Sequence, residues 1–288
     1  MGTLFVIGNG FDLHFGLETT TADFEGFLRE QDIEGEIDNA FDVLNAYGVD
    51  WSEYEQSLAY IDLSAVEADN LGFPDYASDH EYDRDGVIFQ MKEYLDSINK
   101  AVNSALEEMV NAANEALEEG EILTSRPGLF QAGDAVVSFN YTSTVEMLFD
   151  IPDDLPILHI HGYYADDEKL VFGYGEMQGD YHTRLVPDED TDYYEEQQRQ
   201  AIYEFYVGWQ KKPRLKTLKH FLRACQGIDR VVVLGHSMGK VDAKYMELIE
   251  KIINPKKWEI SYYYDPKPME NTLKRYSFKQ KCDFFEFD

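Results

Sequence analysis

The feature that most constrains the fold is a short apolar segment that ends in two closely spaced glycines. Residues 3–7 are followed directly by Gly8, Asn9 and Gly10. An uninterrupted apolar run of this length suits a strand that is buried on both faces, as in a parallel sheet. Glycines at its end allow a tight turn into a helix, whose first N–H groups can face an anion. The segment therefore predicts the first strand of an α/β sheet, followed by a candidate phosphate-binding turn.

The rest of the chain alternates apolar runs of strand length with segments of helical periodicity. The expected later strands span residues 135–139, 157–160, 170–172, 230–234, 258–264 and 283–287. The expected helices span residues 23–29, 37–47, 51–61, 87–119, 214–224 and 241–253. Alternation of this kind predicts an α/β fold with a Rossmann-like, mostly parallel sheet and helices on both faces.

Residues 1–288 are predicted to form a single α/β domain that carries two insertions. A helical block at residues 20–132 separates the first two expected strands, and no linker flanks it. We interpret this block as a large α-helical insertion after the first strand. Residues 176–212 are acidic and rich in tyrosine, and we expect them to form a second insertion or a lid.

The formal net charge of −31 at pH 7 restricts the kinds of molecule that the protein is expected to bind. A surface this acidic repels phosphate backbones and anionic lipids at long range, so nucleic acid and membranes are not expected partners. The two cysteines, Cys225 and Cys282, are too few for a disulfide framework or a usual zinc site. No apolar run reaches the ~18 residues of a membrane-spanning helix, and the first residues lack the basic region of a signal peptide. We expect a cytoplasmic protein without a bound metal.

The sequence that starts at Gly8 matches only the first part of the dinucleotide-binding fingerprint Gly-x-Gly-x-x-Gly. Asp12 lies within this segment, two residues after Gly10. Leu13 occupies the third glycine position. The strand and ribose-binding acid that normally follow about 20 residues later are also missing. These departures argue against an ordinary dehydrogenase. The alternative to a nucleotide site is an ordinary strand-to-helix turn.

A Gly-x-Ser-x-Gly pattern follows the expected strand at residues 230–234. It runs from Gly235 to Gly239, with Ser237 at its centre. The pattern matches the nucleophile elbow of α/β-hydrolases, which place an acid and then a histidine after the serine. No histidine follows His236 in this chain. The alternative interpretation is a second glycine turn at the carboxyl end of a strand, where open α/β sheets bind ligands.

Two further strand ends carry polar side chains that suit catalysis. Asn140 follows the expected strand at residues 135–139, where it is either a site residue or a turn former. His159 lies in the next expected strand and His161 directly follows it, and their spacing on one face of a strand could bind a metal, although no third ligand is evident. His161, beside a glycine, is the better candidate for a general base, whereas His159 suits a hydrogen-bonded core histidine.

Taken together, these blocks resemble the AbiH family of bacterial abortive-infection proteins, which act against phage. The resemblance rests on their order and on their placement at strand ends, and it covers nearly the whole chain. The residues that carry it are 5–13, Gly16, Leu17, Asp23, Phe24, 138–142, Glu146, 159–162, 234–239 and Asp242.

The same order is also similar to sirtuin-like domains that consume NAD. That resemblance implies that Gly8, Asn9, Gly10 and Asp12 hold the phosphates and ribose of the dinucleotide. It also implies a catalytic pair, Asn140 and His161, and contacts to the adenosine side from Gly235, Ser237 and Asp242. The chain departs from sirtuins in lacking their zinc-binding cysteines, which argues against protein deacylation.

These resemblances imply an abortive-infection effector that binds NAD and hydrolyses its bond between nicotinamide and ribose. The implied partners are the dinucleotide, a phage-derived trigger and, as a further candidate, a second copy of the chain. Two alternatives stay open. The chain could be a nucleotide-binding sensor or toxin scaffold without catalysis, or a serine hydrolase that uses Ser237.

Overall fold

The computed structural model describes residues 2–31, 55, 81–120, 128–165, 170–175 and 193–287. The chain divides into two compact units. The first unit comprises residues 1–23, 107–172 and 212–288, and the second comprises residues 24–106 and 173–211. The segments at residues 20–132 and 176–212, which the sequence marks as insertions, supply most of the second unit.

The first unit contains a six-stranded sheet in which every strand is parallel to its neighbours. The strand order is β3-β2-β1-β4-β5-β6, the order of a Rossmann fold. The α/β fold predicted from the sequence is therefore confirmed. The strands are β1 (Gly2–Ile7), β2 (Ala135–Ser138), β3 (Ile157–His159), β4 (Ile228–Leu234), β5 (Lys257–Tyr262) and β6 (Cys282–Glu286).

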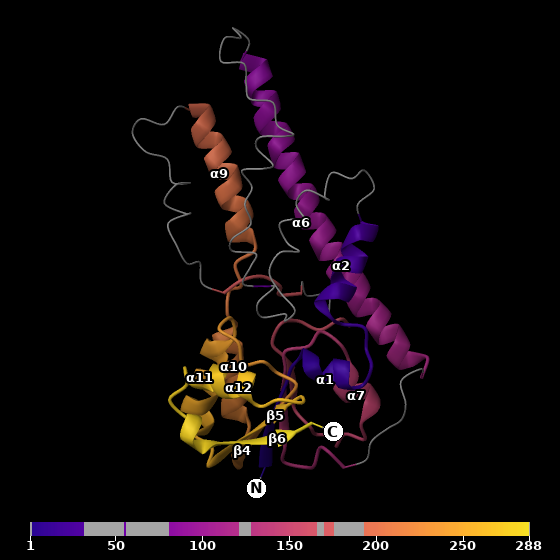
Figure 1. Ribbon diagram of the computed structural model, residues 1–288, viewed down its shortest axis with the longest axis vertical. Helices are drawn as coiled ribbons and strands as arrows, with labels where there is room; N and C mark the ends of the chain where they lie inside the picture. The colour runs from indigo at the N-terminus through magenta and orange to yellow at the C-terminus, as the bar shows by residue number, and fades with distance from the viewer. Residues whose placement is uncertain are drawn as a thin grey trace. The chain divides into compact units, whose positions relative to one another are not determined.

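Helices cover both faces of this sheet, as Figure 1 shows for the first unit. One face packs against α1 (Asn9–His14), α7 (Thr144–Leu148) and the end of α6 (Glu81–Glu118). The other face packs against α10 (Leu215–Ala224), α11 (Ala243–Ile253) and α12 (Lys267–Leu273). A short 3-10 helix, η2 (Lys279–Lys281), precedes β6. The helix α12 was not expected from the sequence.

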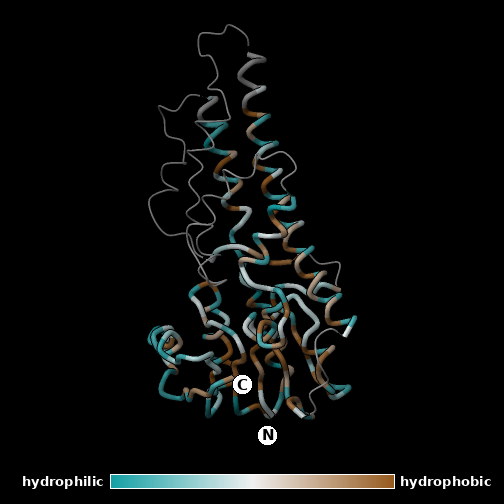
Figure 2. The backbone as a smooth tube through the Cα atoms, turned by 45° about the vertical axis from the view of Figure 1, so that its right-hand side comes forward, coloured by the Kyte–Doolittle hydropathy of each residue, from teal (hydrophilic) through white to brown (hydrophobic). Residues whose placement is uncertain are grey.

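The core lies in two layers, because alternate residues of the central strands point to opposite faces. In β1, Leu4 and Val6 join the layer beneath α10–α12, whereas Phe5 and Ile7 join the layer beneath α1 and α7. Every residue of β1 is buried, which explains its uninterrupted apolar sequence. In Figure 2 the brown, hydrophobic stretches of this unit lie mostly toward its middle, and the teal, hydrophilic ones lie mostly toward its outside.

The strand register brings four strand ends to one edge of the sheet. Ile7 pairs with Leu234 of β4 and with Ser138 of β2, and Ser138 pairs with His159 of β3. The segments that follow these residues therefore leave the sheet side by side. The reversal of strand order between β1 and β4 is the switch point at which open α/β sheets bind ligands.

Some expected elements differ from the structure or lie outside its described residues. No strand forms at residues 170–172, where the Val171 amide instead donates to the carbonyl oxygen of His161 at 2.7 Å. The expected helix at residues 37–47 lies outside the described residues, and so does that at 51–61 apart from Glu55, which is helical. The expected edge strand at residues 283–287 is confirmed as β6.

The second unit contains the first part of α6, most of α2 (Thr21–Glu30) and α9 (Tyr193–Gly208). Its described interior includes an ion pair between the buried side chains of Lys211 and Glu55, with 2.7 Å between Nζ and Oε1. No helix in the described part of the chain is long and apolar enough to cross a membrane.

Candidate functional site

The turns that follow β1 and β4 are in direct backbone contact at the switch point. The Gly10 amide donates to the carbonyl oxygen of Gly235 at 2.8 Å, and the Gly8 amide donates to that of Leu234 at 3.0 Å. A Cβ atom on Gly8 would lie 2.5 Å from the Cα of His236, and one on Gly235 would lie 2.1 Å from the Phe11 nitrogen. The glycines at these two positions are thus required by the close approach of one turn to the other.

This contact uses backbone groups that the sequence analysis assigned to a pyrophosphate. The amides of Gly8, Gly10 and Phe11 all donate within the chain. The side-chain amide of Asn9 donates to the carbonyl oxygen of Thr19 at 2.8 Å. Phosphate binding at this turn stays a prediction. A phosphate there would have to accept hydrogen bonds from amides other than those of Gly8, Gly10 and Phe11.

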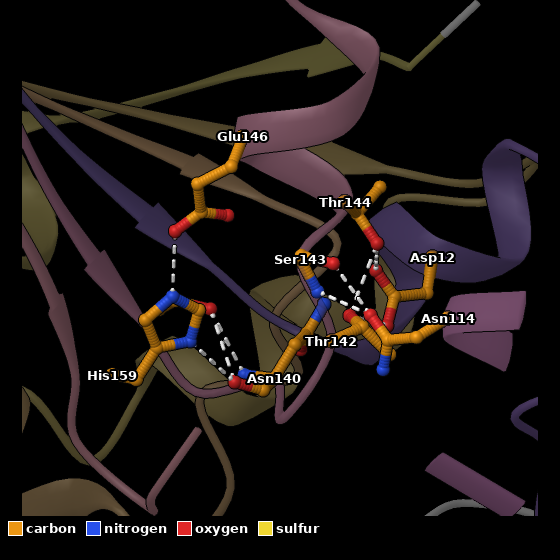
Figure 3. A network of polar contacts seen from close by, with 9 residues as sticks. Asp12, Asn114, Asn140, Thr142, Ser143, Thr144, Glu146 and His159 are labelled. Carbon is orange, nitrogen blue, oxygen red and sulfur yellow. Dashed lines mark hydrogen bonds and ion pairs between the residues drawn. The ribbon is translucent and has the colours of Figure 1, made fainter. Parts of the chain in front are cut away.

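Asp12 lies at the centre of a buried polar network at the ends of β1 and β2 (Figure 3). Its carboxylate is 1% exposed and accepts hydrogen bonds of 2.7 Å from the hydroxyls of Thr142 and Thr144. Burial raises the pKa of Asp12 from 3.8 to about 6, although hydrogen bonds from Thr142, Thr144 and Asn140 lower it in part. The carboxylate of Asp12, which was predicted to bind a ribose, therefore points into the protein interior.

Asn140 joins the ends of β1 and β2. Its side-chain amide donates to the carbonyl oxygen of Gly8 at 3.0 Å, and its backbone amide donates to the hydroxyl of Ser138 at 3.1 Å. The side chain of Asn114 on α6 holds the next part of the same loop, because it accepts hydrogen bonds from the backbone amide and hydroxyl of Ser143.

His159 connects this loop to α7. Its Nδ1 lies 3.0 Å from the carbonyl oxygen of Asn140, and its Nε2 lies 2.9 Å from Oε1 of Glu146. The two ring nitrogens of His159 thus contact two different segments, the loop after β2 and the helix α7. The ring of Tyr163 stacks on His159 with 4.3 Å between centroids. His159 therefore resembles the hydrogen-bonded core histidine that the sequence predicts.

His161 lies with Asp242 and His236 in a second buried cluster. Nε2 of His161 is 3.2 Å from Oδ1 of Asp242, and Nε2 of His236 is 3.7 Å from Oδ2 of the same carboxylate. The ring of Phe139 packs edge-on against both histidines, with centroid distances of 5.1 and 4.3 Å. Asp242 is also the N-cap residue of α11, directly before Ala243, where the positive end of the helix dipole stabilises a carboxylate.

The structure thus distributes the predicted site residues over two neighbouring clusters of the first unit. Asp12 and Asn140 share one cluster with Gly8, whereas His161 and Asp242 share the other. Ser237 is half-buried on the turn after β4, and both ring nitrogens of the adjacent His236 face partners other than Ser237. The rings of His159 and His161 contact different carboxylates. Among the described residues, no three His, Cys, Asp or Glu side chains are arranged so that they could hold a metal ion.

Several groups that complete these clusters were not predicted from the sequence. The Thr142 and Thr144 hydroxyls hold Asp12, and Asn114 holds Ser143. The only available signal was two threonines at alternate positions just after a strand, which is a weak pattern because threonine is common in turns. His236 was considered only as part of the Gly-x-Ser-x-Gly pattern.

A comparison with protein-family models supports the order of these sequence blocks. The family model described as "Bacteriophage abortive infection AbiH" matches residues 4–264, which include the residues of both clusters. No curated protein matches the chain.

Proposed function

The chain belongs to the bacteriophage abortive infection AbiH family, and we propose that it carries out this anti-phage role by binding NAD and hydrolysing it. The bond broken would be the one between nicotinamide and ribose. The dinucleotide would lie along the carboxyl edge of the sheet, across the ends of β1 and β4.

The main support for the proposal is that the candidate residues follow the strands on either side of the point where the strand order reverses. The sheet has the order of a dinucleotide-binding fold, and its switch point lies between β1 and β4. Gly8, Asn140, His161 and Gly235 follow four strands whose carboxyl ends are brought together by the register. A sirtuin-like use of the same residues for NAD is part of this proposal.

The reaction needs little covalent assistance from the protein. The bond between ribose C1′ and the nicotinamide nitrogen breaks with its electron pair leaving on nitrogen, so nicotinamide departs as a neutral base. Water adds to C1′, and His161 accepts one of its protons. Asn140 would orient the water or the ribose hydroxyls through its amide. Positioning of this kind, and general-base catalysis worth about 10²–10⁴-fold, are ordinary contributions of such residues.

Burial of the two candidate catalytic residues implies that the resting protein must rearrange before it acts. His161 is 3% exposed and Asn140 is 6% exposed, and the Phe139 ring packs against His161. A substrate ribose reaches His161 only if this packing opens. Such a requirement suits a defence enzyme that stays silent until a phage-derived trigger binds.

The test is to incubate the purified protein with NAD, alone and with lysate from phage-infected cells, and to measure nicotinamide by chromatography. We expect nicotinamide release that His161→Ala and Asn140→Ala abolish, and that Asn271→Ala, an exposed substitution on α12, leaves unchanged. Circular dichroism and thermal unfolding check that the variants are folded. Full activity in both folded variants would refute the catalytic roles. Absence of nicotinamide with a lysate that activates defence in cells would refute NAD hydrolysis.

The internal hydrogen bonding of the site favours a second candidate, a nucleotide-binding sensor without catalysis. The Asn140 side chain already binds Gly8, and Asp242 already contacts His161. A sensor would bind a nucleotide at the same edge and respond by rearranging these contacts. Calorimetry that detects NAD binding without nicotinamide release, together with intact NAD in infected cells, would favour the sensor over the enzyme.

A further inference from the structure

Asp242 lies between two histidine rings and presents a separate carboxylate oxygen to each. Oδ1 is 3.2 Å from Nε2 of His161, and Oδ2 is 3.7 Å from Nε2 of His236. Both rings are buried, and the carboxylate side chain is 12% exposed. We propose that Asp242 is a positioning residue that fixes the tautomer of His161, with the His236 ring lying beside the other oxygen of the carboxylate.

The hydrogen-bond donors define the tautomer of His161. A carboxylate only accepts, so Nε2 of His161 carries the proton that points at Asp242. The neutral ring then has its lone pair on Nδ1. A general base needs this lone pair at a fixed position, and a carboxylate on the other nitrogen provides that in the Ser-His-Asp enzymes.

The tautomer of His236 is fixed by a separate contact, which comes from the strained turn at Met238. The Met238 amide donates to Nδ1 of His236 at 2.8 Å, so Nδ1 accepts and the proton of the neutral ring lies on Nε2, toward Asp242. Met238 adopts a φ of 52°, a left-handed conformation that is strained for a residue other than glycine. The Tyr276 hydroxyl donates to the Met238 carbonyl oxygen at 2.9 Å and holds the turn in place. The turn thus fixes Nδ1 of His236 as an acceptor and leaves Nε2 as the donor that faces Asp242.

These contacts give Asp242 a role that a ligand to the adenosine side would not need. The carboxylate contacts Nε2 of His161 and lies beside Nε2 of His236, so these contacts are made within the chain and do not depend on a bound ligand. The role of His161 as a base rests on the proposed function, but the tautomer of His161 is a property of the resting protein. The two claims can therefore be tested separately.

The test uses NMR of the full chain labelled with 15N in its histidine rings, which distinguishes protonated from unprotonated ring nitrogens. Spectra of His161→Gln and His236→Gln identify the two signals among the seven histidines. In the wild type we expect Nε2 to be protonated and Nδ1 unprotonated in both rings. In Asp242→Asn, whose amide can donate to Nε2, we expect His161 to lose this single tautomer. Asp265→Asn, which changes an exposed carboxylate, should leave both rings as in the wild type.

Each result decides the proposal without reference to catalysis. An Nδ1-protonated or doubly protonated His161 ring in the wild type would overturn it, and this measurement needs no variant of Asp242 to fold. An unchanged His161 tautomer in folded Asp242→Asn would overturn it as well. If the protein releases nicotinamide, Asp242→Asn should lower kcat by about 10²–10⁴-fold with little change in the Kd for NAD. If no nicotinamide is released, the NMR result still stands, and only the proposed function fails.

Discussion

The side-chain amide of Asn140 donates to the carbonyl oxygen of Gly8, a residue 132 positions earlier in the chain. This bond ties the turn after β1 to the loop after β2 at the edge where the candidate site lies. Gly8 cannot turn away without leaving a buried amide unsatisfied, because Asn140 itself is buried. The bond therefore couples the glycine turn to the loop that carries Thr142 and Thr144.

We expect Asn140→Ala to lower the free energy of unfolding by about 1–3 kcal/mol, since it removes a buried hydrogen bond and leaves the Gly8 carbonyl without this donor. Urea titration followed by circular dichroism measures the change. Asn271→Ala removes an exposed amide and should change stability by less than about 0.5 kcal/mol. Equal stabilities of the two variants would mean that the bond to Gly8 contributes little.

The contact between the two glycine turns leads to a second prediction. Gly235 has a φ of 63°, and a Cβ atom there would lie 2.1 Å from the backbone nitrogen of Phe11. Gly235→Ala should therefore cost about 3 kcal/mol or more, from backbone strain and overpacking together. Gly16 is a matched control, because its φ is 84° and a Cβ atom there would meet no atom of the described residues within 4 Å beyond its chain neighbours. Gly16→Ala should cost only about 1–2 kcal/mol, and a loss as large as that of Gly235→Ala would refute the steric explanation.

The strained turn at Met238 gives a third prediction. The Tyr276 side chain is 2% exposed, and its hydroxyl donates to the Met238 carbonyl oxygen. Tyr276→Phe keeps the ring but removes this donor, so we expect a loss of about 1–2 kcal/mol in urea unfolding. Tyr263→Phe removes the hydroxyl of a side chain that is 63% exposed, and it should change stability by less than about 0.5 kcal/mol. A loss in Tyr276→Phe no greater than that control would show that the turn does not depend on this bond.

The apolar runs of the sequence were sufficient to predict the sheet, because strands buried on both faces have an unmistakable composition. β1 and β4 fall where the apolar runs fall, and the edge strand β6 was expected at residues 283–287. The short run at residues 170–172 was wrongly predicted as a strand. Its Val171 amide bonds to His161 in a loop, and three apolar residues cannot distinguish the two cases. The helix α12 escaped prediction because only Leu273 within it is buried.

The sequence could predict that the candidate residues follow strands of one parallel sheet, whereas the contacts between them could not be predicted. Gly8, Asn140, His161 and Gly235 each follow an expected strand, and parallel strands present their carboxyl ends at one edge of a sheet. The partners of Asp12 depend on packing between segments 130 residues apart, and no local pattern encodes such a distance. The close contact of Gly10 with Gly235 is of the same kind, since either glycine alone suits a ligand-binding turn equally well.

The burial of Asp12 makes stability depend on pH in a direction opposite to that of a salt-bridged carboxylate. Its pKa is about 6 in the folded protein, compared with 3.8 for the ordinary group, because burial disfavours the charged form. Between these values the folded state binds more protons than the unfolded state. The contribution of Asp12 to the free energy of unfolding therefore falls as pH rises from about 4 to about 6. Each pH unit in this window is worth about 1.4 kcal/mol, so the total is about 3 kcal/mol.

Asp12→Asn removes the ionisable group and should remove this part of the pH dependence. Its amide can still accept a hydrogen bond from Thr142 and donate one to the Thr144 hydroxyl, so the network keeps its shape. Urea unfolding between about pH 4 and pH 7 gives the free energy of unfolding of both proteins. The difference between the two values removes the effect of charge repulsion, which both proteins share because the chain is acidic. We expect the variant to gain about 3 kcal/mol on the wild type as pH rises, whereas exposed Asp265→Asn should run parallel to the wild type. Parallel curves for Asp12→Asn and the wild type would show that Asp12 ionises in the folded protein without the cost of burial.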